Sequence, residues 1–139
     1  MSHTTPCYVA VVDDDESLGR SLGRLLRAAG YYSVIYPSAE AFLSDAKQPR
    51  FDCLVLDVQL GGISGMELGR QLAVSGSKAP VVFITARDDP DERAQALRDL
   101  SAVYLRKTEP AETVLAAIRR AIQANAEPAS PSIDKGRVQ

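Results

Sequence analysis

Residues that bind soft metal ions are scarce in this chain of 139 residues. It has one histidine, His3, near the N-terminus, and two cysteines, Cys7 and Cys53, which form no C-x-x-C pair. Structural zinc sites are built mainly from these two residue types, so the composition argues against zinc. Both cysteines fall inside apolar runs, which favours inert buried thiols over a disulfide or a metal site.

The chain also lacks an excess of positive charge and a long apolar run. Its formal net charge is −2, so no basic surface favours direct binding of DNA or RNA. No stretch approaches the ~20 apolar residues of a transmembrane helix. The opening residues MSHTTP have neither the charged nor the apolar region of a signal peptide. We therefore expect a cytoplasmic protein that makes no contact with a membrane.

Strand-like and helix-like patterns alternate along the chain, and the strand-like runs are short and apolar throughout. They are Cys7–Val12, Tyr31–Tyr36, Phe51–Leu56, Val81–Ile84 and Ala102–Leu105. Runs without polar alternation are typical of strands buried on both faces. Five strand–helix units in series predict an α/β protein with a doubly wound, five-stranded parallel sheet. We expect residues 1–126 to form this single domain.

Two segments have weaker patterns. The helix predicted to begin at Pro90 has a narrow apolar face, made by Ala94, Leu97 and Leu100. Residues 127–139 (EPASPSIDKGRVQ) have no periodicity and several Pro, Ser and Gly residues. That composition indicates a flexible tail or a linker stub.

Polar residues stand just after four of the predicted strands. Asp13 and Asp14 follow the first run, Asp57 the third, Thr85 the fourth, and Lys107 lies close after the fifth. The carboxyl ends of parallel strands share one edge of the sheet, and open α/β sheets bind ligands there. The sequence thus predicts three carboxylates, a hydroxyl and an ammonium group around one point.

Such a cluster suits a hard cation and a phosphoryl-like anion. Asp13, Asp14 and Asp57 repel one another unless a proton or a divalent cation intervenes. Magnesium fits an all-oxygen site with few carboxylates, whereas calcium normally needs more ligands. Lys107 would meet a phosphoryl oxygen as a point charge. Asp57 could then act as a nucleophile that forms an aspartyl phosphate.

Taken singly, these residues have simpler interpretations. Asp13 and Asp14, with their neighbour, could cap the following helix, because aspartate is a favoured N-cap. Asp57 could be a turn residue, Thr85 an ordinary strand end, and Lys107 a solvated lysine. Their joint order along the chain is what favours a shared site.

Four stretches resemble the receiver domain of bacterial two-component response regulators. They are VVDDDESLGRSLGRLLRAAGY (residues 11–31), LVLDVQLGGISGMEL (54–68), VVFITA (81–86) and YLRKTEP (104–110). The resemblance spans roughly residues 8–124, and the key positions occur in the family's order and spacing. It implies the flavodoxin-like receiver fold and a phosphorylatable signalling switch rather than an ordinary enzyme.

The resemblance also implies a role for each matching residue. Asp57 would be the phosphoacceptor, Asp14 the direct magnesium ligand and Asp13 its supporting acid. The backbone carbonyl of Gln59 would supply a further ligand. Thr85 would hold the phosphoryl group.

Three more positions carry implied roles. Lys107 would also hold the phosphoryl group, and Tyr104 would move inward when the threonine moves toward the phosphate. Gln59 and Arg87, two positions beyond the acceptor and the threonine, border the path of the attacking water. We expect these two to set the rate of dephosphorylation. Tyr104 could equally be a half-buried packing residue with a wet hydroxyl.

The chain departs from the family pattern at three places. Gly61 stands where proline is usual, and Thr108 replaces the proline whose cis peptide normally follows the lysine. The Lys107–Thr108 bond is therefore expected to be trans, or else to store the 2.5–4 kcal/mol of a non-proline cis bond. Leu100 replaces a glycine, and leucine does not readily adopt the left-handed conformation that ends a helix. We expect an altered junction before the fifth strand.

The implied partners are a histidine kinase or a histidine phosphotransferase, and an output protein that the sequence does not name. Signalling would use the face made by the fourth helix, fifth strand and fifth helix, and a homodimer through the fourth-helix face stays open. The departures at Gly61, Leu100 and Thr108 motivate an alternative, a docking or dimerisation module independent of phosphate. A phosphohydrolase is disfavoured, because Val58-Gln59 offer no second carboxylate beside the nucleophile.

Overall fold

The computed structural model describes residues 6–126 of the chain. His3 and the predicted tail, residues 127–139, lie outside the described residues. Strands and helices alternate as predicted, in the order β1 (Tyr8–Val12), α1 (Glu16–Ala28), β2 (Tyr32–Tyr36), α2 (Ala39–Leu43), β3 (Cys53–Asp57), α3 (Gly65–Val74), β4 (Val81–Thr85), α4 (Pro90–Leu100), β5 (Val103–Arg106) and α5 (Ala111–Ala126). No helix within the described range combines the length and the apolar composition needed to cross a bilayer.

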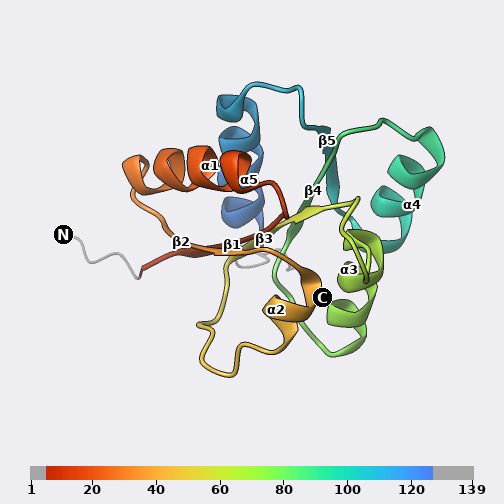
Figure 1. Ribbon diagram of the computed structural model, residues 1–139, viewed down its shortest axis with the longest axis horizontal. Coiled ribbons are helices and arrows are strands. Elements are labelled where there is room, and N and C mark those ends of the chain that lie inside the picture. Colours follow the sequence, from red (N-terminus) through yellow and green to blue (C-terminus); the bar gives the residue numbers. More distant parts are fainter. Residues whose placement is uncertain (1–5, 127–139) are drawn as a thin grey trace, which may run out of the picture.

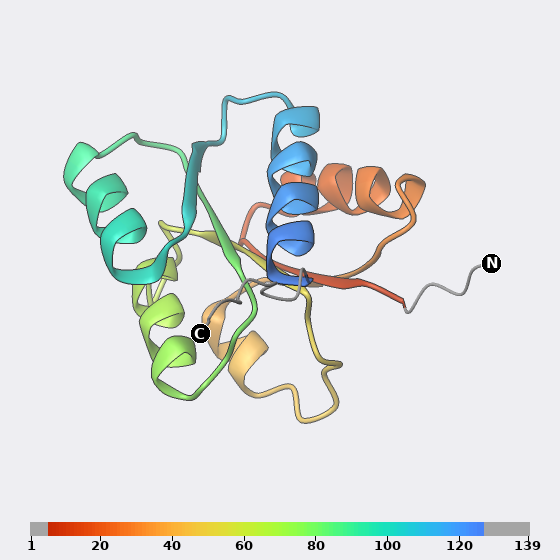
Figure 2. The same ribbon diagram turned by 180° about the vertical axis from the view of Figure 1, so that it is seen from behind.

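The five strands form one parallel sheet in the order β2-β1-β3-β4-β5. Helices α1 and α5 cover one face, and α2, α3 and α4 cover the other, so the domain has three layers (Figures 1 and 2). The winding direction reverses between β1 and β3, which is where this topology places its ligand crevice. The predicted doubly wound, flavodoxin-like fold is confirmed.

The core divides into two clusters, one on each face of the sheet. Because side chains alternate along a strand, Val9 and Val11 of β1 pack beneath α1 and α5, whereas Ala10 and Val12 pack beneath the opposite layer. All four are fully buried. Cys53 belongs to the first of these clusters, and burial raises the pKa of its thiol to about 12. That agrees with the inert buried thiol predicted from the sequence.

Side-chain caps begin four of the helices. Asp15, Ser38, Ser64 and Asp89 each accept a hydrogen bond from a backbone N–H in the first turn of α1, α2, α3 and α4 respectively. Of the three consecutive aspartates, the cap of α1 is thus the third one, Asp15. Asp13 and Asp14 are left for another role.

The apolar face predicted for α4 is wrong at two of its three residues. Ala94 and Leu97 are exposed, Leu97 by 68%, and the fully buried residue is Ala96. Leu100 is partly buried against the core, as its place in the predicted face required. The three-residue spacing proposed from Ala94 to Leu97 was wrong because a helix this polar offers little periodic signal.

The junction after α4 places its left-handed residue one position later than the glycine of the family pattern. Leu100 stays helical, and Ser101 ends the helix with φ 51° and ψ 36°. Left-handed conformations are uncommon for residues other than glycine. The backbone N–H of Ser101 still donates to the Leu97 carbonyl, at 3.1 Å, so the helix ends with a normal hydrogen bond although it has no glycine there.

Gly65 allows α3 to start against the end of β3. A Cβ atom at this position would overlap the backbone carbonyl of Asp57, which belongs to a buried strand and cannot move aside. At Gly61, by contrast, an added Cβ meets nothing within 4 Å.

We predict that Gly65→Ala lowers the free energy of unfolding by about 1–3 kcal/mol, the usual effect of forcing extra volume into a packed site. Gly61→Ala is the matched control in the same loop and should stay within about 0.5 kcal/mol of wild type. Urea unfolding followed by circular dichroism measures both. Equal stabilities of the two variants would contradict the close approach at Gly65.

Candidate functional site

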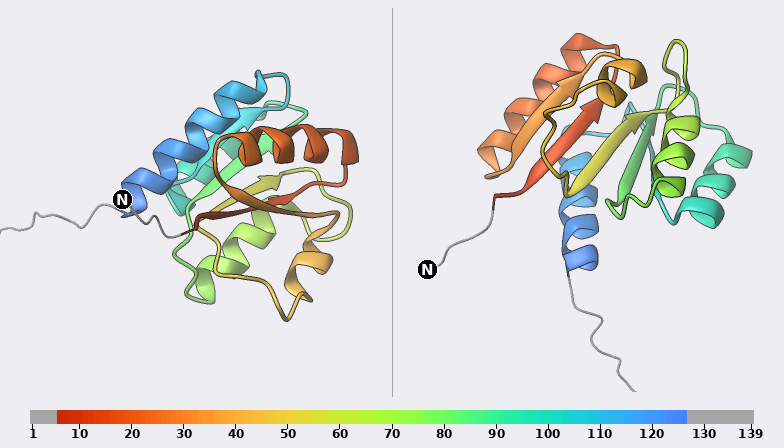
Figure 3. Two further views of the ribbon diagram at one scale, coloured as in Figure 1. Left: turned by 90° about the vertical axis from the view of Figure 1, so that its left-hand side faces the viewer. Right: turned by 90° about the horizontal axis from the view of Figure 1, so that it is seen from below.

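The carboxyl ends of the strands lie along one edge of the sheet, toward which the strand arrows point in Figure 3. Asp13 directly follows β1, Asp57 and Thr85 are the last residues of β3 and β4, and Lys107 directly follows β5. The structure thus brings the predicted residues to one edge, as the parallel arrangement requires. Asp13, Asp57 and Thr85 are at most 1% exposed.

Lys107 links two of the buried carboxylates. Its Nζ lies 3.0 Å from Oδ2 of Asp57 and 3.1 Å from Oδ1 of Asp13, and it donates to both. The Lys107–Thr108 peptide bond is trans, and the Lys107 N–H donates to the Thr85 carbonyl oxygen at 2.7 Å. This backbone bond aims the lysine into the site without the proline of the family pattern.

The pKa values in the site reflect burial and charge. Burial raises the pKa of Asp57 to about 6; the hydrogen bond from Lys107 lowers it in part, and the charge of Asp13 raises it further. Burial alone would lower the pKa of Lys107, but its hydrogen bonds to Asp57 and Asp13 outweigh that effect, so its pKa is raised. The lysine therefore stays charged, and the pair of acids is short of positive charge.

Three carboxylates at this edge could hold a cation. Asp13, Asp14 and Asp57 each offer an oxygen within 4.8 Å of the others. Asp13 Oδ1 accepts from Lys107 and from the Asp15 N–H, but the buried Oδ2 has no hydrogen-bond partner among the described residues. A buried carboxylate oxygen without a donor costs free energy unless a cation meets it. An all-oxygen donor set of this kind fits magnesium.

Gln59 connects the acceptor strand with the end of β4. Its backbone N–H donates to Oδ1 of Asp57 at 3.0 Å. Its side-chain oxygen accepts from the Thr85 hydroxyl at 2.9 Å and from the Ala86 N–H at 3.1 Å. Arg87 meets Thr85 through its backbone and is itself exposed. The sequence indicated these positions, but nothing in it indicated the bridge.

Tyr104 is buried, with 4% of its surface exposed, and is tied to α4. Its hydroxyl donates to Glu92 at 2.9 Å, and the Arg93 guanidinium lies 4.9 Å from its ring centroid. Burial raises the pKa of the hydroxyl to about 12, and the carboxylate of Glu92 adds to the shift. Neither partner could be predicted from the sequence, because charged residues on a polar helix resemble an ordinary solvated face.

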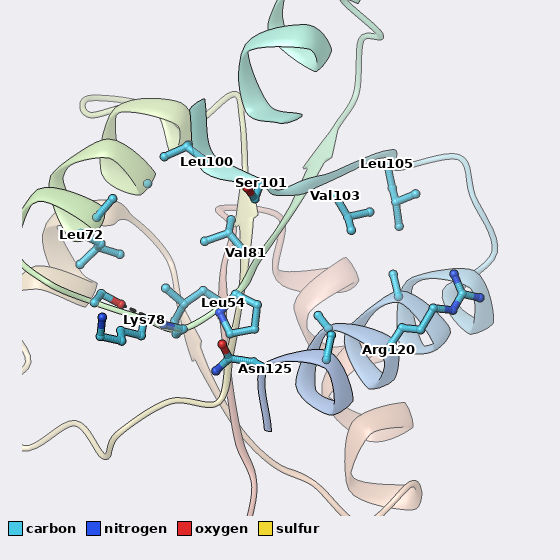
Figure 4. Close-up of a pocket in the computed structure, with 18 of the residues that line it drawn as sticks. Leu54, Leu72, Lys78, Val81, Leu100, Ser101, Val103, Leu105, Arg120 and Asn125 are labelled. Carbon is cyan, nitrogen blue, oxygen red and sulfur yellow. Dashed lines mark hydrogen bonds between the residues drawn. The ribbon is translucent and has the colours of Figure 1, made fainter. Parts of the chain in front are cut away.

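A hollow of about 1060 Å³ lies near the amino ends of the strands, away from these residues (Figure 4). Residues from α3, β4, the α4–β5 junction and α5 line it, among them Leu72, Val81, Leu100, Val103 and Arg120. None of the predicted site residues lines it, so this hollow is separate from the predicted site.

Comparison with known families agrees with this geometry. The response regulator receiver domain matches residues 9–119. The chain therefore belongs to the response regulator receiver domain family, whose members are in general signalling switches.

Curated relatives support the assignment and extend beyond this chain. The response regulator protein TmoT of Ectopseudomonas mendocina is 33% identical over 115 residues, which cover 83% of this chain and 52% of TmoT. The transcriptional regulatory protein FixJ of Bradyrhizobium diazoefficiens is 32% identical over 129 residues, covering 93% and 62%. The chain thus spans about half to three fifths of the length of these relatives.

Solved structures show the same fold. The response regulator StyR is 35% identical with a TM-score of 0.77, covering 88% of this chain and 62% of that one. The chemotaxis protein CheY4 of Vibrio cholerae is 22% identical with a TM-score of 0.75, covering 84% and 99%. The second likeness supports the fold alone.

The raised pKa of Asp57 gives a prediction for the stability of the metal-free protein. A carboxylate whose folded pKa lies above its unfolded value opposes folding once it ionises, so its cost appears as the pH rises from about 4 through about 6. Asp57→Asn should therefore be more stable than wild type at pH 7.5 by about 1–3 kcal/mol, and much less so at pH 4.5. Urea unfolding with a chelator tests this. A larger gain at pH 4.5 would contradict it, and Asp15→Asn serves as the control.

Proposed function

We propose that this chain is the phosphoacceptor switch of a two-component phosphorelay, with Asp57 as the acceptor. The observation that carries the proposal is the placement of the Asp57 carboxylate. It is buried at the sheet edge, 3.0 Å from the Lys107 ammonium, and offers an oxygen within 4.8 Å of oxygens of Asp13 and Asp14. A carboxylate in this setting is a nucleophile with a cationic partner ready for the incoming anion.

Each neighbouring group has a task in phosphoryl transfer. Lys107 would hold a phosphoryl oxygen with its charge, and the Thr85 hydroxyl would donate to another. Both are fixed by the backbone: β4 ends at Thr85, and Lys107 bonds to the Thr85 carbonyl. Positioning and electrostatic stabilisation supply most of the catalysis of phosphoryl transfer.

Asp13, Asp14 and Asp57 would hold a magnesium ion, together with the backbone carbonyl of Gln59. This assignment is supported by the buried Oδ2 of Asp13, which meets no hydrogen-bond partner in the part of the chain that the structure describes. When bound, magnesium would neutralise charge on the transferring group. The family resemblance implies that Asp13 is a supporting acid. Its buried Oδ2, which no described residue contacts by a hydrogen bond, fits that role beside the exposed Asp14.

The phosphoryl donor would be a phosphohistidine on a histidine kinase or a histidine phosphotransferase. The chain would catalyse only its own phosphorylation and a slow hydrolysis, for which we propose Gln59 and Arg87 as rate-setting residues. Output would pass from Thr85 through Tyr104 to the face formed by α4, β5 and α5. The tie of Tyr104 to Glu92 and Arg93 supports this route, because it joins β5 to α4.

The proposed role of Asp57 as the acceptor can be tested directly. Incubation with magnesium and acetyl phosphate should add one phosphoryl group to wild type and none to Asp57→Asn, because the amide is not a nucleophile of this kind. Intact mass spectrometry measures the addition. Uptake by both proteins would place the acceptor elsewhere. No uptake by wild type and by Gln59→Ala alike, with magnesium binding intact, would favour the phosphate-independent docking module.

The proposed magnesium site gives a separate prediction. Magnesium at 100 times its dissociation constant should stabilise wild type by about 2.7 kcal/mol. Asp14→Asn should lose most of this gain, since it removes one of the three negative charges. Asp15→Asn is the matched control, because asparagine caps a helix as well as aspartate does. Thermal unfolding with and without magnesium measures the gain, and an equal loss in both variants would contradict the assignment.

A further inference from the structure

The side chain of Gln59 occupies the donors that a phosphoryl oxygen needs. Its Oε1 accepts from the Thr85 hydroxyl and from the Ala86 N–H, at 2.9 and 3.1 Å. The atom facing Ala86 is the amide oxygen, because a backbone N–H only donates. Two donors that converge on one oxygen have the geometry of an oxyanion site.

This oxyanion site lies beside the acceptor. Asp57 pairs with Ile84 in the sheet register, so Thr85 ends the strand next to it. Neighbouring strands are only ~4.8 Å apart. The backbone N–H of Gln59 is itself bonded to Asp57 Oδ1. One residue therefore contacts the acceptor through its main chain and fills the adjoining oxyanion site with its side chain.

The Thr85 hydroxyl has no free donor in this state. It carries one proton, and two acceptors lie within reach, Gln59 Oε1 at 2.9 Å and the Arg87 carbonyl at 2.6 Å. Its oxygen also accepts from the Arg87 N–H at 3.1 Å. A phosphoryl oxygen on Asp57 can use this hydroxyl only after one of these contacts breaks.

We infer that the Gln59 amide is a removable stopper of the oxyanion site, and that its departure limits the rate at which Asp57 is phosphorylated. This inference rests on the proposed function. It gives Gln59 a role in phosphoryl entry, in addition to the role in hydrolysis proposed above.

The displaced amide has a place to go. A cavity of about 240 Å³ adjoins Gln59 and is lined also by Arg87, Asp88, Asp89, Pro90 and Glu92. Three of these lining residues are acidic, and the amide NH2 can donate to carboxylates. Charged phosphoryl oxygens form stronger hydrogen bonds than a neutral amide oxygen does, so the exchange favours the phosphorylated state.

The step to be measured is transfer from acetyl phosphate. A carboxylate oxygen of Asp57 attacks the phosphorus and forms the new O–P bond. The bond from phosphorus to the acetyl oxygen breaks, and its electron pair leaves with acetate. Gln59 takes no part in this bond exchange; it only vacates or blocks the position of a phosphoryl oxygen.

The test compares Gln59→Ala, which removes the stopper, with Gln59→Met, which keeps the bulk but has no strong acceptor. Both should be phosphorylated about tenfold faster than wild type, the effect of releasing neutral hydrogen bonds to Gln59 Oε1 that are worth about 0.5–1.5 kcal/mol each. Gln71→Ala, on the exposed surface of α3, is the control and should match wild type. Rates come from intact mass against time.

An independent readout uses no phosphoryl donor. The Ala86 amide should exchange its hydrogen with solvent faster in both Gln59 variants than in wild type, because its acceptor is gone. Amide-resolved NMR also verifies that the variants fold.

The outcomes separate the two proposals. If wild type takes up phosphate and both Gln59 variants do so at an equal or slower rate, the stopper is overturned. Faster uptake by Gln59→Ala alone would show that side-chain bulk rather than hydrogen bonding sets the rate, which also overturns it. Uptake by the variants but not by wild type supports a tight stopper. No uptake by any of the proteins overturns the proposed function, and the stopper with it.

Discussion

The site depends on one interaction, the contact of the Lys107 ammonium with the buried carboxylates of Asp57 and Asp13. Two carboxylates that are almost fully buried would be prohibitively costly side by side without a cation. Lysine supplies one positive charge for the pair, and the third carboxylate, Asp14, adds a further negative charge at the rim. The remaining deficit of positive charge is what makes the sheet edge receptive to a divalent ion.

That deficit also fits the switch function proposed for the chain. Within residues 6–126, the buried Oδ2 of Asp13 has no hydrogen-bond partner, and the single hydroxyl proton of Thr85 has two acceptors within the chain, Gln59 Oε1 and the Arg87 carbonyl. A cation and a phosphoryl group would satisfy both at once. Thr85 and Tyr104, which would rearrange in the proposed switch, are both buried, and their polar contacts run to Arg87 in the β4–α4 loop and to Glu92 in α4. Such contacts can exchange at low cost.

The departures from the family pattern turn out to be local. Thr108 follows a trans bond, and Lys107 is aimed by its backbone bond to Thr85. Leu100 stays helical because Ser101 takes the left-handed conformation. Both substitutions alter the support of the site while the functional groups keep their places. Family membership, the fold and the geometry of the site therefore agree.

Much of this protein could be predicted from the sequence, because its signals are periodic. Apolar runs at regular intervals define five buried strands, and polar residues at their ends, from Asp13 to Lys107, must meet once the strands are parallel. Tertiary structure alone decided the rest. The bridge from Gln59 to Thr85 and Ala86 and the hydrogen bond of Tyr104 to Glu92 join residues 12 to 27 positions apart. The exposure of Leu97 depends on which face a polar helix turns to the core. Such contacts leave no pattern in the chain, because nothing in a single charged or amide side chain reveals its distant partner.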